Sequence, residues 1–406
     1  MAIFGRKTVY LLLFALILLS FAMRYPLVDH ERSQTDSYFI HYLSQSIRDE
    51  GYAKWTLSPL SYLGYYPLSY PSATPFLIAE LSAMTGASIE SSILIMNMAI
   101  AALFGVIVFC LAREFTHRVD YCLIAAFFAI LGPRFIDTTY WVGSARGLVV
   151  VLMTMIVFVA FRAAFMGQRK LYVIVIMVTF GAFAAHHMAV LILLYGLGYV
   201  LAGFGGRFLQ RTIIRGEKRL AIVTSFVACL ILALGAMAYL DLLGGSIRTN
   251  FAGGAFNSGP EVLVIMLNLA VSYTHQIGLI LIAAIFGIVA ILRRAPLTTK
   301  ALFPATLLLA IVPVSGNSLY VSMLLSPFVA TIGVVWICEA YKRKARRSIW
   351  KACLVVLAVG SLVFPVWSVS QWNETLYTTR DTAILDSQIF NDAAYLRFTA
   401  GGHYTV

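Results

Sequence analysis

Long apolar stretches separated by short polar connectors dominate this chain. A helix of about 20 apolar residues crosses the roughly 30 Å hydrocarbon core of a membrane, where only helices and closed barrels satisfy the backbone. The pattern predicts an all-α fold, a polytopic transmembrane helical bundle of about 11 spans. We place these spans at residues 8–25, 92–112, 119–134, 147–165, 171–185, 188–205, 220–242, 276–292, 301–315, 319–340 and 351–370.

Two further apolar stretches do not have the length of one upright span. Residues 72–85 are too few to cross the membrane as one helix, and Pro71 and Pro75 lie at the start of the stretch. We therefore expect a helix that lies on or dips into the outer surface. The run 261–293 is too long for one helix. We therefore expect residues 261–272 to lie along the outer interface, with a span after them.

Residues 36–50 have the periodicity of an amphipathic helix. Apolar and polar positions fall on opposite faces, with Phe39, Ile40, Leu43 and Ile47 on one and Ser37, His41, Ser44 and Arg48 on the other. Together with 72–85, this stretch predicts two surface helices in the first outer loop, residues 26–91.

The composition excludes a soluble enzyme. The chain has 406 residues, of which 60% are hydrophobic and 12% charged, and its mean hydropathy is +0.85. The first apolar run follows Arg6-Lys7 and lacks a small-residue cleavage site, so we interpret it as a retained helix and not as a signal peptide. The five cysteines include no CxxC pair and are interpreted as packing residues.

The net charge of +12 is explained by membrane orientation and does not require a nucleic acid partner. The predicted spans place six basic clusters on one side of the membrane: 6–7, 113–118, 162–170, 207–219, 293–300 and 342–351. Because Lys and Arg are enriched in cytoplasmic loops, the N-terminus is predicted inside and the C-terminus outside. This gives one transmembrane domain, 1–370, and an outer tail, 371–406, interpreted as a short tail or as the start of a further domain.

Asp36 is the most informative polar residue of the first outer loop. It follows Thr35, a suitable N-cap, and would lie near His30 and Glu31 at the membrane surface. One interpretation is structural, because a carboxylate in the first helical turn stabilises the helix dipole. The other is chemical, because a general base at this surface can reach a hydroxyl group from the aqueous side.

The first outer loop resembles that of the GT-C superfamily, integral-membrane glycosyltransferases that use polyprenyl- or dolichyl-linked sugar donors. The resemblance is carried by Asp36, the Gly51 that ends the helix, Lys54-Trp55, and the Tyr66-Pro67 to Pro75 segment. Oligosaccharyltransferases and protein mannosyltransferases belong to this superfamily. The resemblance covers roughly residues 8–150 by motif, and the rest of the chain by topology alone.

The resemblance implies a role for several side chains. Asp36 matches the acidic residue that acts as general base or helps to bind metal. Asp137 stands where oligosaccharyltransferases place a second acidic motif, although here it lacks the paired DxD. A divalent metal, Mg or Mn, is therefore one expected cofactor, with no certain ligand set.

Basic residues supply the expected donor-phosphate contacts. Arg146 opens a span at the outer surface, where an Arg binds two phosphate oxygens or simply anchors in the interface. The segment 317–327 lacks the Arg that many relatives carry there, and Arg248 or Lys54 could replace it. Candidates for contact with the acceptor or a metal are His30, Glu31, Asp137, His186 and His187. The alternative interpretation is that they are polar residues at the membrane interface without a role in the reaction.

The sequence thus predicts an inverting membrane glycosyltransferase in the cell membrane, or in the endoplasmic reticulum membrane of a eukaryote. It would transfer a hexosyl or pentosyl group from a polyprenyl- or dolichyl-phosphate donor to a lipid, glycan or protein acceptor on the outer face. One alternative is a transporter or flippase of a lipid-linked substrate, although the predicted spans hold few charges near the midplane. Another is an inactive GT-C-like scaffold.

Overall fold

A computed structural model describes residues 6–26, 31, 35–53, 73–212, 262–294, 298–311, 318–342, 352–353 and 355–363. Within these ranges the regular structure is helical and contains no strand. The predicted all-α class is therefore confirmed for this part of the chain. The predicted span at 220–242 lies outside the described residues.

The chain divides into two compact units, each built from distant stretches of sequence. The first unit combines residues 1–13, 105–134 and 190–364, and the second combines residues 14–104, 135–189 and 365–406. The second unit holds the candidate site residues that the structure describes, and it is described first.

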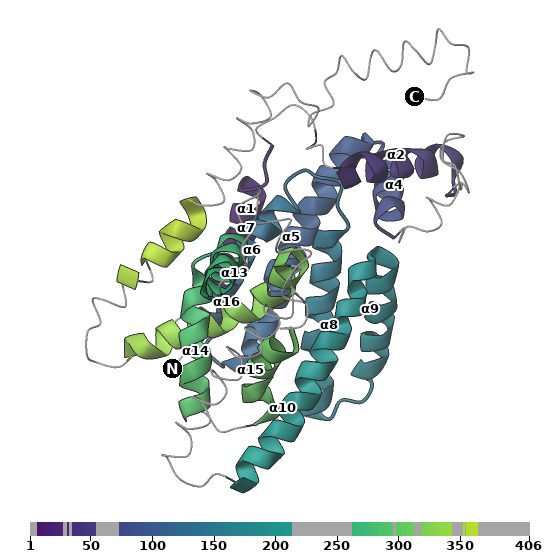
Figure 1. Cartoon of the computed structure of the whole chain (residues 1–406). Helices are drawn as coiled ribbons and strands as arrows, with labels where there is room; N and C mark the ends of the chain where they lie inside the picture. Colours follow the sequence, from purple (N-terminus) through teal and green to yellow (C-terminus); the bar gives the residue numbers. More distant parts are fainter. Residues whose placement is uncertain are drawn as a thin grey trace, which may run out of the picture. The chain divides into compact units, whose positions relative to one another are not determined.

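Four helices belong wholly to the second unit, and parts of four others complete it. The whole helices are α2 (Thr35–Glu50), α4 (Ala73–Thr85), α8 (Arg146–Met166) and α9 (Leu171–Ala185). The shared ones are α1 (Arg6–Ala22), α5 (Ile89–Phe115), α7 (Pro133–Asp137) and the 3₁₀ helix η1 (His187–Leu191). Helices α8 and α9 run side by side, and α2 packs against α4 (Figure 1).

The contact between α2 and α4 buries the apolar face predicted for residues 36–50. Leu43 and Ile47 of α2 pack with Ala79 of α4, and Phe39 and Phe76 flank them. Full burial of one such aliphatic side chain stabilises a fold by roughly 1.5–3 kcal/mol. Both helices predicted for the first outer loop are thus present and pack on each other, while their location at the membrane surface stays a prediction.

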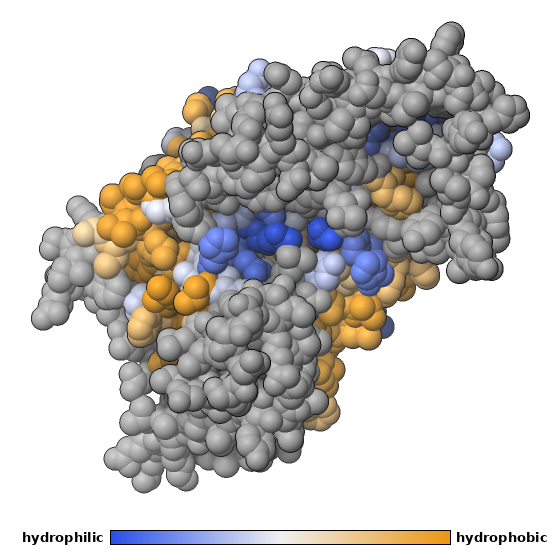
Figure 2. Space-filling view, turned by 45° about the horizontal axis from the view of Figure 1, so that its top comes forward, coloured by the Kyte–Doolittle hydropathy of each residue, from blue (hydrophilic) through white to orange (hydrophobic). Residues whose placement is uncertain are grey.

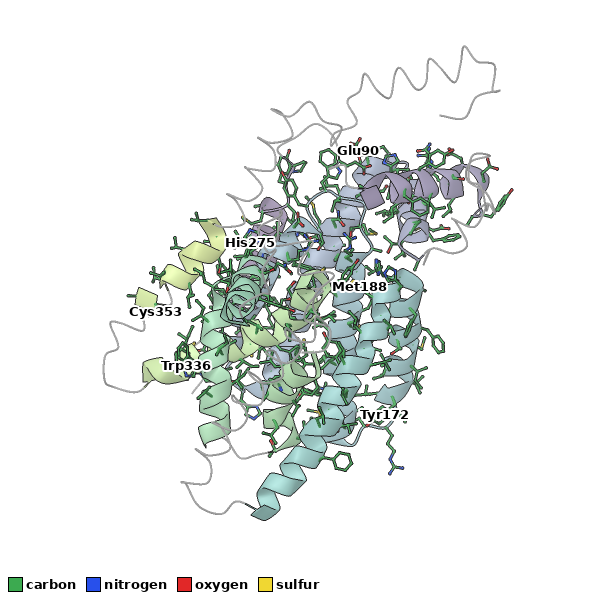
Figure 3. All side chains as sticks on the ribbon, viewed as in Figure 1. Glu90, Tyr172, Met188, His275, Trp336 and Cys353 are labelled. Carbon is green, nitrogen blue, oxygen red and sulfur yellow. The ribbon has the colours of Figure 1, made fainter. Side chains whose placement is uncertain are left out.

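Among the described residues, the helices of the first unit include α6 (Val119–Ile130), α10 (Ile192–Thr212), α13 (Val262–Ile277), α14 (Ile280–Arg294), α15 (Thr299–Ile311) and α16 (Ser318–Lys342). Its largest helix contacts are those of α10 with α15 and of α14 with α16. Phe286 of α14 stacks on Trp336 of α16, with ring centroids 5.4 Å apart; Trp336 is labelled in Figure 3.

Two glycines allow α14 and α16 to approach closely. A Cβ built on Gly287 would lie 2.8 Å from Ile332 Cγ2, and one built on Gly333 would lie 2.9 Å from the carbonyl oxygen of Ile280. Real Cβ contacts are not that short, so each helix requires a residue without a side chain at this point. Small residues at helix interfaces serve the same purpose in membrane proteins generally.

The long 261–293 run is broken at Gly278. The stretches Ala270–Ile277 and Ile280–Val289 meet at 112°, and Gly278 has a φ of +99°, which L side chains rarely adopt. The expectation that this run is not one straight helix is confirmed. The predicted span 119–134 is also shorter than expected, because α6 ends at Ile130 and the separate α7 begins at Pro133.

Among the described residues, four helices are long and apolar enough to cross a membrane, or five if the bent pair is counted as one span. They are Ile89–Phe115, Arg146–Met166, His187–Phe204 and Tyr320–Cys338. Large apolar side chains such as Phe180 of α9 and Leu193 of α10 remain exposed, and orange apolar residues cover much of the described surface in Figure 2. Because water would not solvate such surfaces favourably, the chain is a membrane protein.

Candidate functional site

The described candidate residues belong to the end of the second unit where α2, the beginnings of α5 and α8, and the end of α9 are found. Asp36 is the second residue of α2. Its neighbour Ser37 is fully buried, and its Oγ accepts a hydrogen bond of 2.8 Å from the Gly143 N–H. The loop of residues 138–145, which connects α7 to α8, is thereby attached to the helical turn that carries Asp36.

Gly143 must be small for this contact to form. A Cβ at this position would lie 3.0 Å from both the carbonyl oxygen and the Oγ of Ser37, which is tighter than most real contacts. The backbones of the first turn of α2 and of loop 138–145 therefore touch directly. Three residues beyond Gly143, Arg146 begins α8.

Two more hydrogen bonds fix the neighbouring residues of this loop. Trp141 Nε1–H donates to the carbonyl oxygen of Glu90 at 3.0 Å, and Asn97 Nδ2–H donates to the carbonyl oxygen of Val142 at 2.9 Å. Glu90 and Asn97 both belong to α5. Residues 141, 142 and 143 are thus each held by a different side-chain hydrogen bond.

Trp141 has a strained backbone. Its φ is +40°, the only positive φ of a non-glycine residue in the described ranges, and its side chain is buried. A bulky residue in this region costs about 1–3 kcal/mol and persists only where surrounding contacts impose it. Such outliers gather at functional sites, which makes the loop a candidate part of the site.

Arg24, in the turn that follows α1, contacts the beginning of the same loop. Its side chain is fully buried; Nε donates to Thr139 Oγ1 at 2.7 Å, and Nη1 donates to Ser20 Oγ at 3.0 Å. The guanidinium also lies 5.1 Å from the centre of the Phe135 ring, within cation–π range. Sequence reasoning missed this residue, although a charge inside a predicted span was a usable signal.

Glu31 and His41 form a pair that links the first outer loop to α2. Glu31 is buried, and its Oε1 lies 2.6 Å from His41 Nδ1. The backbone N–H of Glu31 donates to Glu90 Oε1 at 2.6 Å, and Figure 3 labels Glu90 near α2. Of the acceptor candidates, Glu31 is therefore held in place by residues of α2 and α5.

His186 and His187 lie just past the end of α9, with ring centroids 4.0 Å apart. His186 is buried and its Nδ1 accepts a hydrogen bond of 3.0 Å from the Met188 N–H; in Figure 3, Met188 and Tyr172 mark opposite ends of α9. Burial lowers the pKa of His186 from 6.5 to about 4, and the positive charges of His187 and Arg146 add to the decrease. His186 is therefore neutral near pH 7, with its proton on Nε2.

A set of metal ligands is not found in the part of the chain that the structure describes. No three His, Cys, Asp or Glu side chains there are grouped so that they could hold an ion. Asp137 is the last residue of α7 and has no second Asp of a DxD pair. Among the described donor groups, none forms the cluster of three that a divalent metal ion needs.

The remaining predicted site residues, His30, Lys54 and Arg248, lie outside the described residues. The structure brings the turn carrying Asp36 to the loop that precedes Arg146, and it brings His186 within electrostatic range of Arg146.

The apolar helices of the described residues define a helical membrane protein. The chain belongs to DUF6541, a family of unknown function, whose sequence model matches residues 5–328. No curated protein matches the sequence.

Solved structures of the oligosaccharyltransferase from Archaeoglobus fulgidus have a similar fold. The apo form has a TM-score of 0.65 at 12% identity, over 97% of this chain and 58% of that one. Its complex with an inhibitory peptide and a dolichol-phosphate has a TM-score of 0.63 at 11% identity, over 98% and 58%. The chain thus spans less than two thirds of these proteins, and the expected resemblance is confirmed for the fold.

Proposed function

We propose that this protein is a glycosyltransferase that moves a sugar from a polyprenyl- or dolichyl-phosphate donor to an acceptor on the outer face of the membrane. The observation that carries the proposal is the Ser37–Gly143 hydrogen bond. It joins the turn of the proposed base, Asp36, to the loop that leads to the proposed phosphate ligand, Arg146. The oligosaccharyltransferase-like fold supports the same reaction class.

In this proposal the reaction is one displacement. The acceptor oxygen attacks the anomeric carbon, Asp36 takes its proton, and the bond between that carbon and the phosphate oxygen breaks. The lipid phosphate leaves with the electron pair, and the configuration at the anomeric carbon inverts. Arg146 stabilises the charge on the leaving phosphate, because its guanidinium can bind two oxygens at once, and Arg248 and Lys54 are further candidates for this contact.

The neighbouring structures suggest the substrates to test. One archaeal oligosaccharyltransferase structure contains a dolichol-phosphate, and another is tethered to an acceptor peptide containing the NVT sequon. A third contains Zn and sulfate. For this chain we propose a lipid-linked donor, a lipid, glycan or protein acceptor, and contact with membrane lipids. We propose Mg or Mn as the divalent metal, and the assay below measures transfer with and without each ion.

The proposed reaction needs the site at the outer face. We propose 11 crossings with the N-terminus inside, in a cell membrane or an endoplasmic reticulum membrane. Single cysteines at Ser88, near the proposed outer end of α5, and at Gln168, between α8 and α9, test this orientation in intact cells. Labelling of Ser88→Cys alone by an impermeant maleimide is expected, and labelling of Gln168→Cys alone would reverse the orientation.

The decisive experiment compares Asp36→Asn with Asp49→Asn. Asp49 is an exposed residue in the last turn of the same helix, so it controls for loss of a carboxylate. The purified proteins are mixed with polyprenyl-phosphate mannose, glucose or arabinose, with and without Mg²⁺ or Mn²⁺. We expect transfer by the parent chain and Asp49→Asn and none by Asp36→Asn, with donor binding retained.

Three results would redirect the assignment. Equal turnover by Asp36→Asn would remove this residue from the chemistry. No donor binding by the parent chain would reject the glycosyltransferase, and uptake of a lipid-linked substrate by sealed vesicles would then favour the transporter or flippase. Co-purification of a stable partner without either activity would favour the inactive scaffold.

A further inference from the structure

The hydrogen bonds to residues 141–143 converge on a loop with one strained residue. Trp141 is held through its indole by Glu90, Val142 through its carbonyl oxygen by Asn97, and Gly143 through its N–H by Ser37. Two of these hydrogen bonds are made by residues of α5, and the third is made by a residue of α2. A loop fixed in this way has little freedom to move relative to either helix.

Asn97 is the most unusual member of this arrangement. It is fully buried in α5, a helix long and apolar enough to cross a membrane. Its Nδ2 donates to Val142, whereas its Oδ1 has no hydrogen-bond partner among the described residues. An unsatisfied buried acceptor costs about 1–3 kcal/mol of stability. This cost offsets much of the stability gained from the hydrogen bond that Nδ2–H donates to Val142.

The net contribution of this amide to stability is therefore small, while its effect on the loop is specific. The bond fixes the carbonyl oxygen of Val142, immediately before the residue that touches Ser37. Displacing that carbonyl would displace Gly143 and the connection from Asp36 to Arg146. Misplacing a catalytic group by about 1 Å can cost about 100-fold in rate.

We propose that Asn97 is a positioning residue, which acts through Val142 to hold the turn of Asp36 at a fixed distance from Arg146. This inference rests on the proposed function for its catalytic consequence. Its structural part, the seating of loop 138–145 on α2, can be measured without any substrate.

The test uses Asn97→Leu, which keeps a similar volume but removes the amide. The matched control is Thr154→Val on α8, because Thr154 is also buried and donates only within its own helix, to the carbonyl oxygen of Val150. Hydrogen–deuterium exchange of the Gly143 amide, which donates to Ser37 Oγ, reports contact between loop and helix without altering either residue.

We expect Asn97→Leu to speed exchange of the Gly143 amide at least about ten-fold and Thr154→Val to leave it unchanged, while exchange along α9 stays at the parent rate in both variants. With active protein, Asn97→Leu alone should lower kcat by about 10- to 100-fold, with the KM for the donor little changed. A general loss of folding would instead speed exchange along α9 as well.

Each outcome decides a different point. An unchanged exchange rate of the Gly143 amide in Asn97→Leu overturns the positioning role, whatever the activity. Faster exchange with an unchanged kcat also overturns it, because the position of the loop would then have no effect on the reaction. If the parent chain transfers no sugar, the proposed function fails, and the exchange rate alone still tests whether Asn97 holds the loop on α2.

Discussion

Ser37 and Gly143 are separated by 106 residues and joined by a hydrogen bond of 2.8 Å. Both residues are buried, so the contact is protected from water. It connects the first helix after α1 with the loop that opens α8. The polar face predicted for residues 36–50 is therefore used for contacts within the protein, and Ser37 and Ser44 of that face are fully buried.

Removing the Ser37 hydroxyl should destabilise this connection. Ser37→Ala leaves the buried N–H of Gly143 without its acceptor, which costs about 1–3 kcal/mol. Ser44→Ala is the control on the same helix, since Ser44 Oγ donates only to the carbonyl oxygen of Ile40 one turn earlier. Thermal unfolding in detergent should show a lower midpoint for Ser37→Ala than for Ser44→Ala, and equal midpoints would contradict the assigned role of the bond.

A methyl group at Gly287 should separate α14 from α16. Its Cβ would lie 2.9 Å from the carbonyl oxygen of Ile332, and backbone cannot move aside cheaply, so we expect a loss of about 1–3 kcal/mol. Gly196→Ala on α10 is the control, because nothing lies within 4 Å of its Cβ. The control should unfold at the parent temperature or slightly above it, since Ala favours a helix over Gly. The prediction fails if Gly287→Ala and Gly196→Ala unfold at the same temperature.

Acid should weaken the second unit through His186. The unfolded chain binds this proton near pH 6.5 and the folded chain only near pH 4, so stability decreases as the pH falls from about 6.5 towards about 4. In His186→Asn, the amide oxygen can still accept the Met188 N–H, but nothing titrates. Unfolding midpoints measured from pH 7 to pH 4.5 should therefore decline less steeply for His186→Asn than for the parent chain. His117→Asn, at an exposed position away from His186, is the control, and an unchanged slope in His186→Asn would reject this source of acid sensitivity.

The hydroxyl of Thr139 should contribute more to the stability of the folded protein than its methyl group does. Thr139→Val keeps the shape but removes the acceptor for Arg24 Nε, and a hydrogen bond to a charged group is worth about 1.5–3 kcal/mol. Thr139→Ser keeps the oxygen and loses one methyl group. We expect the unfolding midpoint of Thr139→Val to be clearly below that of Thr139→Ser; the reverse order would mean that packing against Gly147 dominates.

Hydropathy predicted most of the described helices, because a membrane imposes both their length and their apolar character. The predicted span 319–340 corresponds to α16 at Ser318–Lys342, and 147–165 corresponds to α8 at Arg146–Met166. The stretch predicted as one span at 119–134 is divided in the structure between α6 and α7. Hydropathy alone does not reveal the helix break before Pro133. The number of crossings and the orientation stay predictions.

The contacts of the candidate site could be predicted much less well. The sequence placed Asp36 at the start of a helix and Arg146 at the start of another, since both follow from local pattern. It gave no reason to pair Ser37 with Gly143, or Arg24 with Thr139, because hydrogen bonds over more than 100 residues depend on how helices pack. A single Asn97 in an apolar run was a visible signal that sequence reasoning left unused.

The burial of Arg24 has a consequence for the order in which the protein is made. Its partner Thr139 follows 115 residues later, and at about 5–20 residues per second a ribosome needs roughly 6–23 s to add them. Throughout that interval the guanidinium, two residues past the end of α1, must be accommodated by water, lipid headgroups or the insertion machinery. The turn after α1 therefore completes its packing only once the residues that follow α7 have been made.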